Sequence, residues 1–206
     1  MKNNPCYLAL ATFIFWVGTS FTQRKMNGQT TDSASLGQYS SLQHDVQAVS
    51  STISVLYGAD YSRVESYVQA AVNHEAQIGI PATVVVSIAV YESSFKSQLF
   101  EESGNPFGIK AGKDWGGLVV YHRDDGTYTP FRRYGSAEEA VLDFGRFIQA
   151  RRWYDDARSC SRYDYVCVVD GLKKTAHEPG YSTNPEWDEK VVELIERLGL
   201  EVLSER

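Results

Sequence analysis

The chain lacks three features that would assign it to common classes of protein. It has no excess of basic residues: its formal net charge is −6 at pH 7, whereas a general nucleic-acid binder is expected to present a basic surface. It has only three cysteines and four histidines, and neither the cysteines nor His74 have partners at the spacing of a zinc site. It also has no run of about twenty apolar residues, the length that crosses a bilayer as a helix. The sequence therefore argues against nucleic-acid binding and against a zinc centre.

A shorter apolar run lies close to the N-terminus. Residues 7–21 are mostly apolar and follow one lysine, which is typical of the central region of a signal peptide. Gly18 and Ser20 are small enough to stand before a cleavage site. An uncleaved anchor is the alternative. We expect residues 1–22 to be a signal peptide or membrane anchor, and both predict export.

The next segment, residues 23–59, combines a polar stretch with an apolar pattern. Its first half, to about Gln43, is rich in Ser, Thr, Gln and Gly, which favours a linker with too little apolar surface to fold. A short amphipathic helix is then expected to lie on the domain or lead into it. The folded domain is expected to span residues 60–206. The apolar residues of the short helix are Leu42, Val46, Val49, Ile53 and Leu56.

An acidic residue interrupts the most apolar part of the chain. Residues 82–91, after Pro81, are apolar on nearly every side and predict a buried helix. Helical spacing places Glu92 in line with Val85 and Ile88. Desolvation favours the neutral form of a carboxyl, so we expect a raised pKa and a role as general acid. The alternative is that Glu92 merely ends the helix and faces water.

A change of period follows this helix. Residues 118–121 and 127–131 are β-prone and flank a connection that contains glycine, which predicts a β-hairpin. Ser136, with Glu139 three residues later, then predicts the start of another helix.

Four segments together resemble one known family. They are Glu-Ser-Ser-Phe at 92–95, Gly-Asn-Pro-Phe-Gly-Ile-Lys at 104–110, Phe-Arg-Arg-Tyr-Gly-Ser at 131–136 and Gly-Tyr-Ser-Thr-Asn-Pro at 180–185. Their order and spacing are similar to those of the N-acetylglucosaminidase domain of glycoside hydrolase family 73, a group of bacterial peptidoglycan hydrolases. The resemblance covers about residues 62–200.

This resemblance implies an α+β, lysozyme-like fold, mainly helical with a small β-hairpin lobe. It implies the glycan strands of peptidoglycan as the binding partner and no metal or organic cofactor. Together with the N-terminal segment, it predicts an exported protein of the periplasm or cell envelope, either free or anchored through residues 7–21.

The resemblance also implies a second catalytic carboxylate in the hairpin lobe, and there this chain departs from the family. The position of the family's glutamate falls on His122. The hairpin offers two turn aspartates instead, of which Asp124 is the favoured replacement, although aspartates are common in turns without any catalytic role. If neither serves, the 2-acetamido oxygen of the substrate could act as nucleophile, with Tyr181 orienting the acetamide or a water.

Four further residues are candidates for sugar binding: Asn105, Phe107, Tyr121 and Tyr134. For Phe107 and Tyr134, packing in the core is an equal alternative.

Two cysteines lie close together in a tyrosine-rich segment. Cys160 and Cys167 could close a small disulfide in an oxidising compartment. The alternative is two unpaired thiols.

The function that these observations favour is an endo-β-N-acetylglucosaminidase that cleaves the β-1,4 bond after N-acetylglucosamine, with Glu92 as general acid. Two alternatives stay open at this point. One is a muramidase or lytic transglycosylase on the same fold, and the other is a non-catalytic peptidoglycan-binding module of an envelope machine.

Overall fold

The computed structural model describes residues 33–124, 126–173, 175 and 179–204. The signal peptide or anchor predicted at residues 1–22 therefore lies outside the described residues. Within the described part of the chain, no helix combines the length and apolar character needed to cross a membrane.

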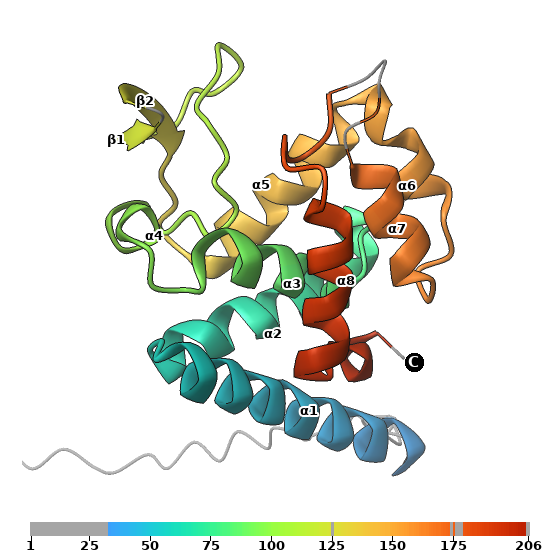
Figure 1. Cartoon of the computed structure of the whole chain (residues 1–206). Coiled ribbons are helices and arrows are strands. Elements are labelled where there is room, and N and C mark those ends of the chain that lie inside the picture. The colour runs from blue at the N-terminus through green and yellow to red at the C-terminus, as the bar shows by residue number, and fades with distance from the viewer. Residues whose placement is uncertain (1–32, 125, 174, 176–178, 205–206) are drawn as a thin grey trace, which may run out of the picture. The chain divides into compact units, whose positions relative to one another are not determined.

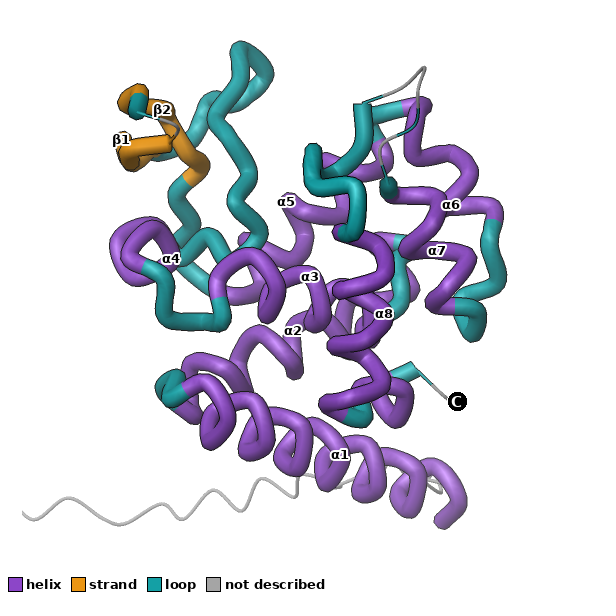
Figure 2. Tube along the Cα trace, viewed as in Figure 1, coloured by secondary structure: helices purple, strands orange, loops and turns teal. Residues whose placement is uncertain are grey.

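The predicted architecture, mainly helical with a small β-hairpin lobe, is confirmed (Figures 1 and 2). The elements are α1 (Ser33–Tyr57), α2 (Tyr61–Ile78), α3 (Ala82–Ser93), α4 (Gln98–Ser103), β1 (Val119–Asp124), β2 (Thr127–Arg132), α5 (Ala137–Gln149), η1 (Arg152–Tyr154), α6 (Asp155–Ser159), α7 (Tyr165–Leu172), α8 (Trp187–Leu198) and η2 (Leu200–Leu203).

Helix α3 lies at the centre of the fold, between α2 and α8 (Figure 1). Every residue from Ala82 to Val90 is buried, as its lack of a polar face predicts. The helix ends at Ser94, which adopts a left-handed conformation with φ of 49°. The next residue, Phe95, is also left-handed at φ of 52°. Two such residues in succession are unfavourable, and the burial of the Phe95 ring against Tyr67 compensates.

Helix α1 is longer than the sequence indicated. It begins at Ser33, so the residues expected to form the end of a linker are helical. Val46, Val49 and Ile53 are buried in the same core as α2 and α3, whereas Leu56 is exposed. The helix is longer than predicted because these three buried side chains hold it on the core. Tertiary packing of this kind stabilises a helix even when its first half is rich in Ser and Gln.

The hairpin lobe is a two-stranded antiparallel sheet in which Val119 pairs with Arg132 and Asp124 with Thr127. Gly126, at φ of 81°, provides the turn. A bridge from Lys110 to Phe131 adds a third piece of chain to the β2 edge.

A buried ion pair attaches this lobe to the helices. Arg132 Nη1 donates to Asp143 Oδ2 on α5 at 2.8 Å, and the Tyr134 hydroxyl donates to the same oxygen at 2.7 Å. All three residues are buried. Helix α5 itself starts with the predicted reciprocal cap, because Ser136 Oγ accepts from Glu139 N while Glu139 Oε2 accepts from Gly135 N. Loss of one partner from a buried ion pair leaves an uncompensated charge, so the lobe depends on this cluster.

Cys160, at the end of α6, forms a disulfide with Cys167 in α7. The bond joins two short helices on the side of the molecule away from the hairpin (Figure 1).

Replacing Gly145 by Ala is expected to destabilise the protein, although Ala usually stabilises a helix by about 1 kcal/mol relative to Gly. A Cβ at Gly145 of α5 would lie 2.4 Å from Cγ2 of Ile78 at the end of α2, and such overpacking costs about 1–3 kcal/mol. Urea unfolding measures the difference. Gly116→Ala is the matched control, since a Cβ there meets nothing within 4 Å. A Gly145→Ala protein as stable as the wild type would contradict this account of the α2–α5 contact.

Candidate active site

Glu92 occupies the last turn of α3, where the buried helix reaches the surface of the domain. Burial raises the pKa of its carboxyl from 4.5 to about 7, and a hydrogen bond from the Trp187 indole limits this rise. Trp187 Nε1 donates to Glu92 Oε1 at 3.2 Å. A single neutral donor does not replace the water that a carboxylate loses on burial. Glu92 is therefore a carboxyl group that can hold its proton near neutral pH, as the sequence predicted.

The segment 104–110 forms the wall that faces Glu92, and Asn105 fixes its shape. The Asn105 side chain is 1% exposed. Its Nδ2 donates to the carbonyls of Ile109 and Arg132, at 2.9 and 3.1 Å, and its Oδ1 accepts from the amides of Phe107 and Ile109, both at 3.2 Å. Because all of these partners are main-chain groups, Asn105 shapes the turn. Direct sugar contact does not fit this buried side chain.

Gly108 brings its main chain close to the acid. Its φ is 62°, a conformation that other residues rarely adopt, and a Cβ built there would lie 3.8 Å from Glu92 Oε2. Glycine therefore serves two needs at this position: it permits the left-handed turn, and it keeps the face of the carboxyl open.

Tyr181 links the two walls. Its hydroxyl donates to the Phe107 carbonyl at 2.8 Å, and its ring stacks on Trp187 with centroids 5.4 Å apart. Burial, and then the charge of Glu92, raise the pKa of Tyr181 well above its ordinary value. The phenol thus stays neutral and keeps its proton for donation. Tyr181 also holds the indole that donates to Glu92, so it acts on the acid through Trp187.

Glu92, Phe107, Gly108 and Tyr181 border an open cleft of about 610 Å³. Lys110, Thr129 and Pro130 line it on the side of the hairpin, and residues from the end of α5, from η1 and from 179–181 line the other side. The full lining comprises Glu92, Phe107, Gly108, Ile109, Lys110, Ala111, Gly112, Asp114, Thr129, Pro130, Phe147, Arg151, Trp153, Tyr154, Pro179, Gly180 and Tyr181.

The structure brings together some of the predicted site residues. Glu92, Phe107 and Tyr181 line the cleft. The Phe107 ring is buried on Phe144, with centroids 4.6 Å apart, so its packing alternative holds for the ring. Its carbonyl receives the Tyr181 hydroxyl.

Asn105 and three other predicted residues lie outside the cleft lining. Asp124 lies at the end of β1 and forms an ion pair with Lys110, with Nζ and Oδ2 2.7 Å apart. Tyr121 is 63% exposed and pairs with Pro130, whereas His122 is half-buried on the other face of the strand. Tyr134 is buried and donates to Asp143, so its packing alternative holds as well.

Several residues of the site carry no recognisable signal in the sequence. Trp187 is the second residue after Pro185 and looks like an ordinary apolar position of α8, while Asp114, Arg151 and Trp153 lie in segments without a recognisable pattern. An acid next to an apolar helix needs a nearby hydrogen-bond donor, and a Trp indole could serve. The chain has four Trp residues, and no spacing in the sequence shows which one donates to Glu92.

A carboxyl with a raised pKa at the end of a buried helix, in a cleft beside a small hairpin lobe, is the arrangement of the general acid in a lysozyme-like glycosidase. A family model for Glucosaminidase, described as mannosyl-glycoprotein endo-beta-N-acetylglucosaminidase, matches residues 68–200. The chain therefore belongs to this family, glycoside hydrolase family 73, and is a glycoside hydrolase. The predicted family is confirmed.

Solved structures agree with this assignment. The peptidoglycan hydrolase of Sphingomonas sp. A1 is 28% identical with a TM-score of 0.58, over 68% of this chain and 91% of that one. The glycoside hydrolase domain of FlgJ from Salmonella typhimurium is 24% identical with a TM-score of 0.55, over 67% and 87%. At that identity the second likeness shows the fold alone. No match was found among curated proteins.

Replacing Glu92 by Gln is expected to stabilise the protein at alkaline pH. Between pH 4.5 and about 7 the native carboxyl holds a proton that the unfolded chain has released, so the stability of the wild type falls as pH rises through this window. The loss stays below about 3 kcal/mol, the limit set by about 1.4 kcal/mol per pKa unit, because Glu92 is exposed at the surface and solvent screens its charge. Gln avoids this loss because it never ionises.

Urea unfolding of both proteins near pH 4 and near pH 9 measures this difference. The advantage of Glu92→Gln should be present only at the higher pH. An advantage of the same size at both pH values would show that burial does not perturb this carboxyl.

Proposed function

We propose that this glycoside hydrolase is an endo-β-N-acetylglucosaminidase that cleaves the β-1,4 bond after N-acetylglucosamine in the glycan strands of peptidoglycan. The observation that carries the proposal is the Glu92 carboxyl, with a pKa of about 7 and in contact with the cleft. The family name indicates N-acetylglucosamine as the sugar. The similar structure from Sphingomonas is a peptidoglycan hydrolase, which supports peptidoglycan as the polymer.

Glu92 is the general acid of this mechanism. Cleavage breaks the bond between the anomeric carbon and the leaving oxygen, and an oxygen that leaves as an alcohol needs a proton. A pKa near neutrality lets the acid be protonated before the reaction and ionised after it. The open face of the carboxyl towards Gly108 is the place for the leaving oxygen, since Trp187 occupies Oε1 and Gly108 lies over Oε2 without a side chain.

The cleft also suits a polymer. It is open rather than enclosed, and its walls mix apolar rings with glycines, as expected for a chain of sugars that enters from one side and leaves from the other. Tyr181 is proposed to orient the acetamide or a water at the reacting sugar. Its hydroxyl already donates to the Phe107 carbonyl, so its own contact with the substrate would have to share that proton or use the oxygen lone pairs.

We also propose that the protein acts outside the cytoplasm. A polymer of the cell wall is found there, and the Cys160–Cys167 disulfide suits an oxidising compartment. Export through residues 1–22 is part of this proposal.

Digestion of purified peptidoglycan, followed by borohydride reduction and mass spectrometry, tests the proposed function. The wild type should release fragments with reduced N-acetylglucosamine ends, and Glu92→Gln should lower the rate by at least about 100-fold because a general acid contributes roughly that much or more. Reduced muramic ends would indicate a muramidase, and anhydro-muramic ends a lytic transglycosylase. Each of these results would contradict the proposed bond.

Replacing Trp187 by Phe is expected to move the alkaline limb of the pH–rate profile upward by about one pH unit. The ring can still stack on Tyr181, but the N–H that favours the ionised form of Glu92 is gone, so the pKa rises and the active, protonated acid persists to higher pH. The profile of kcat against pH measures the shift.

Trp115→Phe is the matched control for this prediction, because Trp115 Nε1 donates to the Leu118 carbonyl and not to Glu92. Its alkaline limb should coincide with that of the wild type. A downward shift in Trp187→Phe, or an equal shift in both variants, would contradict the role of the indole.

A further inference from the structure

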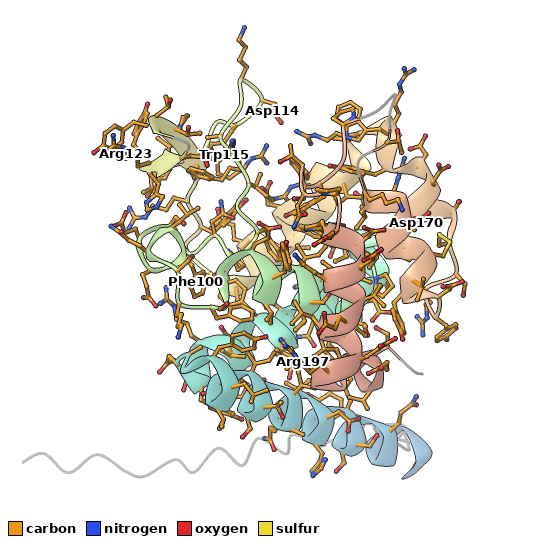
Figure 3. The ribbon with its side chains drawn as sticks, in the orientation of Figure 1. Phe100, Asp114, Trp115, Arg123, Asp170 and Arg197 are labelled. Atoms are coloured by element: carbon orange, nitrogen blue, oxygen red, sulfur yellow. A yellow bond between two sulfur atoms is a disulfide. The ribbon has the colours of Figure 1, made fainter. Side chains whose placement is uncertain are left out.

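Besides Glu92, one carboxylate borders the cleft in the described part of the chain: Asp114. It lies in the loop between the bridge at Lys110 and the start of β1, near the top of the view in Figure 3. The side chain is 61% exposed. Asp124, which the sequence favoured as the second acid, does not border the cleft and is paired with Lys110.

The Asp114 carboxylate is exposed but held in place. Arg132 Nη2 lies 3.1 Å from Asp114 Oδ2, and Arg151 Nη2 lies 3.9 Å from the same oxygen. Arg132 is fixed in turn, because it is only 5% exposed, pairs with Asp143 and lies over the Trp115 ring at 4.8 Å. Exposed ion pairs are weak partly because both side chains must give up conformational freedom to form them. Here Arg132 is already fixed, so its ion pair holds the Asp114 carboxylate in one position.

One oxygen of this carboxylate is left for another partner. Among the described residues both ion pairs of Asp114 use Oδ2, and neither uses Oδ1. Gly112 makes room for Oδ1, since a Cβ at Gly112 would lie 2.6 Å from it. An anchored carboxylate with one free oxygen at a water-accessible cleft can accept a hydrogen bond from a water molecule.

The two cleft carboxylates have opposite surroundings. The Glu92 carboxyl is partly desolvated and has one neutral N–H donor, whereas Asp114 faces solvent and two guanidinium groups. Paired carboxylates in contrasting environments are what a glycosidase needs when one must give a proton and the other must take one.

We propose that Asp114 is the general base of the reaction, a proposal that rests on the function proposed above. Asp114 Oδ1 accepts one proton from a water, and the water oxygen forms a bond to the anomeric carbon. The bond from that carbon to the leaving oxygen breaks, and the leaving oxygen takes the proton of Glu92. Asp114 ends protonated and Glu92 ionised, and one proton returned from Asp114 to Glu92 through solvent restores the enzyme. Water enters opposite the leaving group, so the first product has the inverted, α configuration.

Three variants test this assignment on peptidoglycan: Asp114→Asn, Asp114→Ala and Asp124→Asn. Asp114→Asn keeps the shape of the side chain and is expected to lower kcat by about 100-fold or more with little change in KM, since general-base catalysis contributes about that factor. Added formate should restore part of the kcat of Asp114→Ala by supplying a small carboxylate. Asp124→Asn should retain more than half of the wild-type kcat.

Two controls separate chemistry from folding. Asp170→Asn is a matched surface change, because Asp170 of α7 forms an ion pair with Lys173 and lies far from Asp114 in Figure 3. Thermal unfolding of every variant shows whether a fall in kcat comes from loss of stability, because the substitutions at Asp114 also remove its ion pair with Arg132. Proton NMR of the earliest wild-type product gives the anomeric configuration.

These experiments distinguish a failure of the Asp114 assignment from a failure of the proposed function. If the wild type releases no fragments, the proposed function fails, whatever Asp114 does. If the wild type cleaves, the assignment of Asp114 is overturned by any one of three results: Asp114→Asn with more than half of the wild-type kcat, an Asp114→Ala loss that formate does not reverse, or a first product in the β configuration. The last result would favour participation of the substrate acetamide.

Discussion

The structure depends on placing a carboxyl at the end of a helix that has no polar face. Helix α3 is buried from Ala82 to Val90 because α2 and α8 pack against it, and Glu92 lies where this helix reaches the surface, with its carboxyl still partly removed from water. Burial of an acid costs free energy, and a single indole N–H offsets only part of it. The remaining cost is stored as a raised pKa, which is the property that a general acid requires. The packing that buries α3 therefore forms the core and also raises the pKa of Glu92.

The rest of the site is built by polar side chains that never reach solvent. Asn105 holds the turn that places Gly108 over the acid, and Arg132 holds both the hairpin lobe and the loop of Asp114. Asn105 joins its own turn to the main chain of Arg132, and Arg132 joins the hairpin to α5 and to the loop of Asp114. Buried polar groups that are fully paired fix one arrangement of the surrounding chain, and here they fix the width and shape of a cleft between two lobes.

Much of this could be predicted from the sequence where the signal is local. The apolar helix ending at Glu92, the hairpin and the cap at Ser136 each depend on a few neighbouring residues. The motif around Asn105 predicts sugar binding, because the sequence shows the motif but not the contact of this side chain with Arg132. The same limit hid Asp114, whose place at the cleft depends on an arginine from another element. Helix α1 was underestimated for a related reason: its stability comes from contacts with α2, which composition does not reveal.

The central claim is that burial makes Glu92 a proton donor at neutral pH, and carbon-13 NMR of labelled glutamate side chains tests it most directly. The resonance that is missing from Glu92→Gln identifies the Glu92 carboxyl in the wild type. The account predicts that this resonance titrates with a pKa of about 7. A titration at the ordinary value of 4.5 would contradict it, because the acid would then be ionised before any substrate arrived.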